Sequence, residues 1–131
     1  MSDPHFVGVL RLEPDDSDPS GNTLVVASKH FAFYDDDGLA WEAKPGDKTD
    51  GASIPWLFKP IVGHSFQTPY LSAAVLHDIY CKSKVRTWQA TDEMFYEAMI
   101  TNGVNFVKAG AMWSAVYSFG PHWPKPKEAS P

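Results

Sequence analysis

The sequence has little cysteine and no obvious export or membrane segment. Cys81 is the only thiol among 131 residues. A single thiol excludes an intramolecular disulfide framework and indicates a reducing compartment, or a particle assembled in one. The first residues contain no cationic segment followed by an apolar run, so we expect no export signal. Proline and glycine interrupt the long uncharged stretches, so we expect no transmembrane segment.

Basic residues are also few. The chain has 11 lysines and arginines against 16 aspartates and glutamates, a net charge of -5. A clustered basic surface is typical of nucleic-acid binding, so we expect no nucleic-acid partner. Apolar residues are abundant: 44% of the residues are hydrophobic and 14% are aromatic. This composition and length predict a globular domain with its own core.

Apolar and aromatic runs in the first 45 residues predict a small antiparallel β meander. The runs are 5–12, 24–27, 30–34 and 39–42. The segment Asp35-Asp36-Asp37-Gly38 joins the last two, and Asp-Gly between such runs is a strong hairpin signal. Three aspartates also suggest a calcium loop, but such a loop needs ligands from several further positions. We therefore favour a plain hairpin.

The second half predicts three helices. Thr68-Pro69 supplies an N-cap and a first-turn proline for a helix that ends near residue 82. A second helix starts at Thr87 or Thr91, and a third covers 104–119. We therefore expect a single α+β domain over 1–121, in which 1–45 is the meander, 46–67 a metal or pocket loop and 68–120 the helices. Residues 122–131 form a proline-rich extended tail.

The predicted first helix carries two titratable neighbours, His77 and Asp78. Adjacent helical residues point about 100° apart, so His77 can face a partner helix while Asp78 faces the loop around Asp50. Asp92 lies in the apolar stripe of the second helix, where a carboxylate is costly unless paired. If the two helices pack together, Asp92 reaches a ring nitrogen of His77.

Such a pair has a recognised chemistry. The carboxylate fixes the tautomer of His77 and leaves its other nitrogen to accept a proton from water. Tyr80 and Tyr96 are candidate hydroxyl partners of Asp92. Cys81, one turn after His77, is a candidate thiol nucleophile, but a buried cysteine is more often a small hydrophobic residue. Taken singly, His77 can be a core residue and Asp92 a charge near a helix N-terminus.

Asp50 and Asp78, with the carbonyl of Gly51 or a neighbour, form an oxygen-only ligand set. Such ligands suit calcium better than magnesium, manganese or zinc. Ser53, in the same loop, is a supporting candidate. A cation beside a histidine-activated water can hold an oxyanion, so the set predicts ester or amide hydrolysis.

Four motifs follow one another between residues 49 and 120: 50–55 (DGASIP), 73–80 (AAVLHDIY), 92–95 (DEMF) and 112–120 (MWSAVYSFG). Their order resembles a phage and prophage family of unknown function, domain of unknown function 1353. It is also similar to the bacterial and fungal branch of the phospholipase A₂ fold. The cysteines that brace those lipases are absent.

The lipase resemblance implies a three-helix phospholipase A₂-like core. It implies His77 as the base, Asp92 as its dyad partner, and Asp50 and Asp78 as calcium ligands with a carbonyl near Gly51. We therefore expect a phage protein that hydrolyses a phospholipid or other ester with calcium, located in the host cytoplasm or the virion.

The alternative is a non-enzymatic head or tail protein of the phage. In it the same residues form a structural polar network, and the tail docks on other phage structural proteins with Trp56, Trp113 and Trp123. A third option is hydrolysis of a cell-wall amide.

Overall fold

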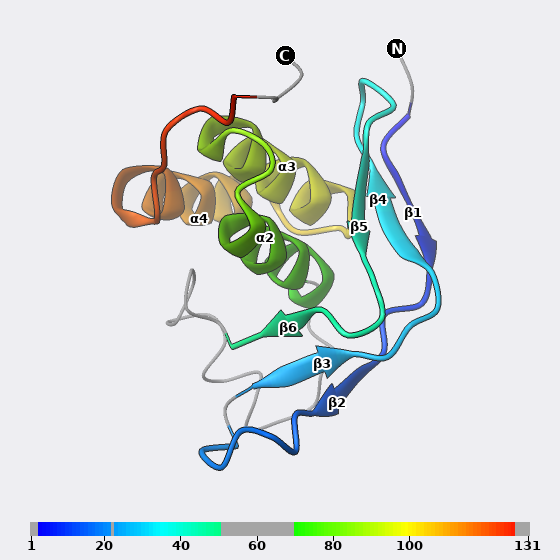
Figure 1. The fold of residues 1–131 in the computed structure, drawn as a ribbon. Coiled ribbons are helices and arrows are strands. Elements are labelled where there is room, and N and C mark those ends of the chain that lie inside the picture. Colours follow the sequence, from blue (N-terminus) through cyan, green and yellow to red (C-terminus); the bar gives the residue numbers. More distant parts are fainter. Residues whose placement is uncertain (1–2, 22, 51–69, 128–131) are drawn as a thin grey trace.

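The computed structural model describes residues 3–21, 23–50 and 70–127. Strands occupy the first two of these regions, and helices occupy the last (Figure 1). The predicted α+β class is therefore confirmed. The loop that contains Gly51, Ser53 and Trp56, and the expected helix start at Thr68-Pro69, lie outside the described residues.

The strands form two small sheets in which all neighbours are antiparallel. The first sheet has the order β1-β4-β5 and the second β2-β3-β6. Their bounds are β1 His5–Gly8, β2 Leu12–Pro14, β3 Leu24–Val26, β4 Phe31–Tyr34, β5 Ala40–Ala43 and β6 Lys48–Thr49. The sequence predicted one meander, whereas the chain changes sheets between β1 and β2, between β3 and β4, and again between β5 and β6.

Gly8 explains why the expected strand over 5–12 is divided. Its φ is +85°, in the left-handed region that favours glycine. A Cβ at this position would lie 2.1 Å from the carbonyl oxygen of His30. The backbone therefore turns from one sheet to the other at a residue that must be glycine.

The predicted hairpin is present between β4 and β5. The Asp35 amide donates to the carbonyl of Leu39 (3.0 Å), and Gly38 has a φ of 78°. The Asp35 carboxylate accepts from the amides of Asp37 and Leu39 and, at 2.9 Å, from the indole of Trp41. Asp35, Asp36 and Asp37 can bring oxygens close together, but the first carboxylate already supports the turn.

The helices agree closely with their predicted spans. They are α2 Leu71–Ser83, α3 Trp88–Thr101 and α4 Phe106–Phe119. Thr87, the first of the two candidates, caps α3 by accepting from the amide of Ala90 at 3.1 Å. Asn105 caps α4 in the same way. No helix in the described ranges is long and apolar enough to cross a bilayer.

The central helix α2 is buried on most of its circumference. It packs against α3 on one side and against β5 and β6 on the other (Figure 1). Neighbours that point about 100° apart on such a helix are therefore both inside the protein, and His77 and Asp78 each have 0% exposure. Each polar group must find a partner on the side that it faces.

The first residues of the predicted tail pack against the helices. The ring of His122 stacks on Trp88 with 3.6 Å between centroids. Trp123 is buried and its indole donates to the carbonyl of Arg86 at 2.8 Å. The assembly hypothesis placed Trp123 on a neighbouring chain, but here it packs on its own fold because its indole N–H finds a carbonyl between α2 and α3.

Candidate functional site

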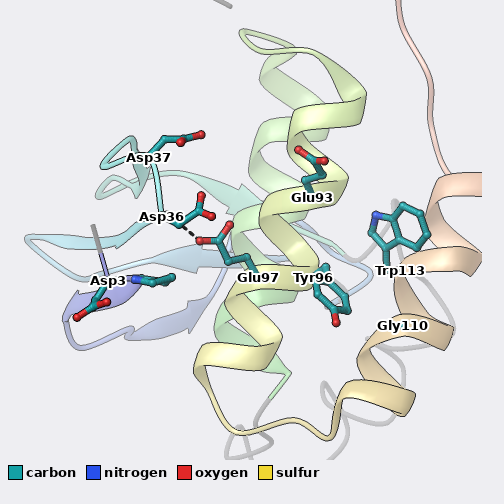
Figure 2. A pocket seen from close by; sticks show the side chains of 9 residues that line it. Asp3, Asp36, Asp37, Glu93, Tyr96, Glu97, Gly110 and Trp113 are labelled. Atoms are coloured by element: carbon teal, nitrogen blue, oxygen red, sulfur yellow. Dashed lines mark hydrogen bonds between the residues drawn. The ribbon is translucent and has the colours of Figure 1, made fainter. Parts of the chain in front are cut away.

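An acidic groove opens between the β4–β5 hairpin, α3 and α4 (Figure 2). Its volume is about 1010 Å³, and its lining residues are Asp3, Pro4, Asp36, Asp37, Glu93, Tyr96, Glu97, Gly110 and Trp113. Glu97 accepts from the Asp36 amide at 2.6 Å, which joins the hairpin to α3. Burial raises the pKa of Glu97, and the carboxylates of the hairpin add to that rise. Of the predicted site residues that the structure describes, only Tyr96 lines this groove.

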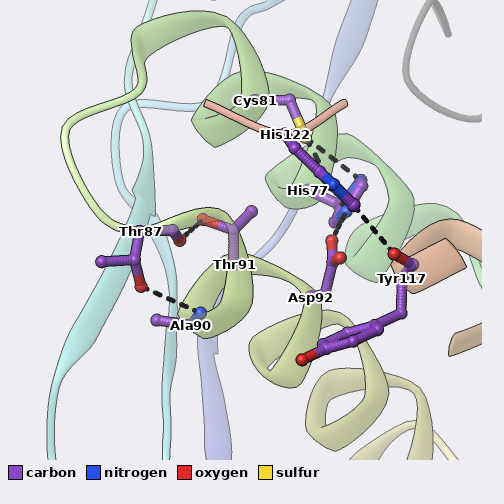
Figure 3. Close-up of polar contacts among 8 residues, drawn as sticks. All are labelled: His77, Cys81, Thr87, Ala90, Thr91, Asp92, Tyr117 and His122. Carbon is purple, nitrogen blue, oxygen red and sulfur yellow. Dashed lines mark hydrogen bonds and ion pairs between the residues drawn. The ribbon is translucent and has the colours of Figure 1, made fainter. Parts of the chain in front are cut away.

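The histidine and aspartate that the sequence paired do meet, between α2 and α3. His77 Nε2 lies 2.6 Å from Asp92 Oδ1, and the side chains are 0% and 2% exposed (Figure 3). A contact this short between an imidazole and a carboxylate is a charge-assisted hydrogen bond. With Nε2 donating to the carboxylate, Nδ1 becomes the nitrogen that can accept a proton.

Cys81 lies beside the ring of His77. Its sulfur is 3.6 Å from Nδ1 and 3.7 Å from Nε2. A sulfur that is almost equidistant from both nitrogens does not lie on the in-plane axis of either, so the geometry is not that of a thiol aligned for proton transfer. Phe95 packs against the same ring with 4.9 Å between centroids. Cys81 therefore packs against His77 as a small hydrophobic residue, which is the interpretation that the sequence favoured over a nucleophile.

The second oxygen of Asp92 has no hydrogen-bond partner in the part of the chain that the structure describes. The two tyrosines that were expected to donate a hydrogen bond to Asp92 lie elsewhere. The hydroxyl of Tyr80 accepts from the Glu42 amide at 2.9 Å, and Tyr96 lines the acidic groove. A buried acceptor without a donor costs about 1–3 kcal/mol. Among the described residues, Asp92 therefore depends on His77 for its stabilisation.

Asp78 faces the segment around Asp50, as the helical spacing predicted. Its Oδ2 accepts from the hydroxyl of Thr49 at 2.7 Å and from the Asp50 amide at 3.3 Å. Thr49 is fully buried in β6. The sequence missed Thr49 because the two-residue strand β6 gives no periodic signal.

Lys82 was also missed, although it stands one turn after Asp78. Its ammonium lies 2.9 Å from Asp50 Oδ1 and 3.5 Å from Asp78 Oδ2. The four-residue spacing of an aspartate and a lysine was a visible signal of a helical ion pair. The two carboxylates predicted to hold calcium thus share the ammonium of a lysine.

Calcium needs six to eight oxygen ligands. The described residues supply two carboxylates, and a lysine already bridges them. A cation held there would contact the ammonium and be repelled by it, so these residues as arranged do not fit a calcium ion. Gly51 and Ser53, the other predicted members, lie outside the described residues.

These observations define an α+β domain whose helical half buries a histidine–aspartate pair beside a lysine-bridged pair of carboxylates. The chain belongs to the family described as Protein of unknown function (DUF1353), whose family model matches residues 25–116. The match extends from β3 into α4 and includes every residue of the two pairs. The family predicted from the motif order is thus confirmed.

Two proteins of Sinorhizobium fredii (strain NBRC 101917 / NGR234) are similar to the chain. Uncharacterized protein y4iH is 45% identical over 118 residues, which make up 90% of this chain and 48% of that protein. Uncharacterized protein y4jT is 44% identical over 108 residues, or 82% of this chain and 32% of that protein. The chain therefore spans half or less of these relatives. No solved structure matches it.

Proposed function

We propose that the chain carries a phospholipase A₂-like hydrolase site, in a protein of phage or prophage origin. The observation that supports this function is the 2.6 Å hydrogen bond between His77 Nε2 and Asp92 Oδ1. It leaves Nδ1 as the proton acceptor, which is the arrangement that a water-activating base requires. The phage or prophage origin is proposed because the order of the motifs resembles that of a phage and prophage family.

In the proposed reaction, His77 Nδ1 removes a proton from water while the water oxygen forms a bond to the ester carbonyl carbon. The carbonyl oxygen becomes an oxyanion, and Asp92 stabilises the imidazolium that forms on His77. Collapse of the intermediate breaks the ester C–O bond, and the leaving alkoxide takes the proton from Nδ1. Water is thus added across the ester, and His77 returns to its neutral form.

Lys82 bridges Asp50 and Asp78, the residue beside the base in the sequence, and so brings a positive charge to this pair. Calcium, the cation that the resemblance implies, is the alternative occupant, and Asp50 and Asp78 would hold it once Lys82 had moved away. His77 has no exposed surface, so the site must open before substrate and water reach Nδ1.

The test is a hydrolysis assay with three substrates: phosphatidylcholine vesicles, a soluble short-chain ester and a cell-wall muramoyl-peptide amide. The proteins are the wild type, Asp92→Asn and the matched control Asp16→Asn, an exposed aspartate between β2 and β3. We expect fatty-acid release from the vesicles and a loss of about 10²–10⁴-fold in Asp92→Asn, with Asp16→Asn unchanged. Cleavage of the amide alone would favour the cell-wall alternative. Turnover of no substrate by the wild type would refute the hydrolase.

The second candidate is a non-enzymatic structural or assembly protein of the phage. The complete burial of His77 favours it, because a structural polar network needs no access. So does the apolar surface of α4, where Phe106, Val107 and Phe119 are 70%, 66% and 90% exposed. For this candidate we expect self-association in light scattering that Phe106→Ser and Phe119→Ser abolish. A wild type that is monomeric at high concentration and has ester turnover would exclude it.

A further inference from the structure

We propose that Lys82 is the resident cation of the Asp50–Asp78 pair and takes the place that the lipase resemblance gives to calcium. The carboxylate of Asp78 is 1% exposed. A buried carboxylate needs both hydrogen-bond donors and an opposite charge. The hydroxyl of Thr49 and the amide of Asp50 are neutral donors. Among the described residues, Lys82 is the cation that contacts Asp78.

The ammonium is held from two directions. It lies 2.9 Å from Asp50 Oδ1, at the end of β6, and 3.5 Å from Asp78 Oδ2, one turn earlier on α2. The Asp50 side chain is 40% exposed and that of Lys82 39%, so the charged group is at the surface while Asp78 is inside. The ammonium therefore contacts the two carboxylates from the solvent side, while the Thr49 hydroxyl and the Asp50 amide donate to Asp78 inside the protein.

A divalent ion cannot share this place with the ammonium. Two like charges about 4 Å apart repel each other even in water, and more strongly where the surroundings are less polar. Calcium binding at Asp50 and Asp78 must therefore displace Lys82, and the affinity for calcium is reduced by the cost of that displacement. We predict that Asp50 and Asp78 do not bind calcium as long as Lys82 is present.

For the reaction the inference rests on the proposed function, since Asp78 adjoins the base His77. Lys82 then acts as a positioning residue, because it holds Asp78 without touching a reacting atom. Ester hydrolysis is accordingly independent of calcium. This separates the chain from the calcium-dependent chemistry that the motif order implies, while the histidine and its aspartate keep their roles.

The test compares the wild type with Lys82→Gln, which removes the charge, and Lys82→Arg, which retains it. Calcium binding is measured by calorimetry, and thermal unfolding is followed with and without millimolar calcium. We expect no calcium response in the wild type or Lys82→Arg. Lys82→Gln should melt at a lower temperature and bind calcium at least about ten-fold more tightly than the wild type. Asp78→Asn in the Lys82→Gln background should abolish that gain.

Three results would overturn the inference. The first is a wild type that binds calcium as tightly as Lys82→Gln. The second is a Lys82→Gln protein that melts like the wild type, since Lys82 would then not be the cation of the pair. The third is a destabilised Lys82→Gln protein that calcium does not rescue, since the pair would then be an ordinary ion pair. Melting and calorimetry need no turnover, so a protein without hydrolase activity can still confirm or refute the role of Lys82.

Discussion

Removal of the Asp92 carboxylate is the perturbation that measures how strongly the buried pair supports the fold. Breaking a buried pair by deleting one partner typically costs about 3–5 kcal/mol. Here part of that cost is offset, because Asp92 Oδ2 has no hydrogen-bond partner in the described structure, and its removal relieves about 1 kcal/mol, the lower end of the cost of a buried acceptor without a donor. We therefore expect Asp92→Ala to lower the free energy of unfolding by about 2–4 kcal/mol.

Asp92→Asn separates the charge from the hydrogen bond. The amide oxygen of asparagine can still accept from His77 Nε2, so we expect a smaller loss of about 1–2 kcal/mol. Glu93→Ala, the exposed neighbour on α3, should change stability by less than about 0.5 kcal/mol. The assay is urea unfolding followed by tryptophan fluorescence, and the variants are compared at an unchanged m-value.

A loss below about 1 kcal/mol in Asp92→Ala would refute this reasoning, because a change that small is typical of exposed ion pairs. An Asp92→Asn variant less stable than Asp92→Ala would contradict the assigned hydrogen bond. In that case the asparagine oxygen would not be accepting from Nε2.

Two further predictions concern the fold around the site. Gly8→Ala places a Cβ 2.1 Å from the His30 carbonyl at a φ of +85°, so it should cost more than about 2 kcal/mol in urea unfolding, and a neutral result would refute the close approach. The raised pKa of Glu97 means that its contribution to stability is complete below the unfolded pKa near 4.5 and is lost as the pH rises through the folded value. Glu97→Gln should therefore melt at a higher temperature than the wild type at about pH 7 and at the same temperature at about pH 3.5. The corresponding gain in the free energy of unfolding at about pH 7 should be no more than about 1 kcal/mol. A lower melting temperature of Glu97→Gln at about pH 7 would contradict the prediction.

Local signals in the sequence predicted much of the fold. The helices follow a 3.6-residue period with recognisable caps such as Thr87, and the hairpin at 35–38 follows its Asp-Gly pair. The meeting of His77 with Asp92 could also be predicted, because an unpaired carboxylate in an apolar stripe demands a partner on the helix that packs beside it. Each of these inferences needs only residues close in sequence or one helix–helix contact.

The rest depends on contacts between distant residues. The break at Gly8 exists because the chain passes the carbonyl of His30, and β6 exists because it pairs with β3. The Tyr80 hydroxyl bonds to the amide of Glu42 instead of Asp92, because its side of α2 packs against β5. Nothing local in the sequence encodes these partners.

The central claim is that His77 is the base of an ester hydrolase, and the most direct measurement is the hydrolysis rate of His77→Gln beside that of the wild type. Both proteins must first show the same fold by circular dichroism, because His77 is buried. The account predicts that phosphatidylcholine hydrolysis falls by about 10²–10⁴-fold in His77→Gln. Equal rates in the two proteins would contradict it.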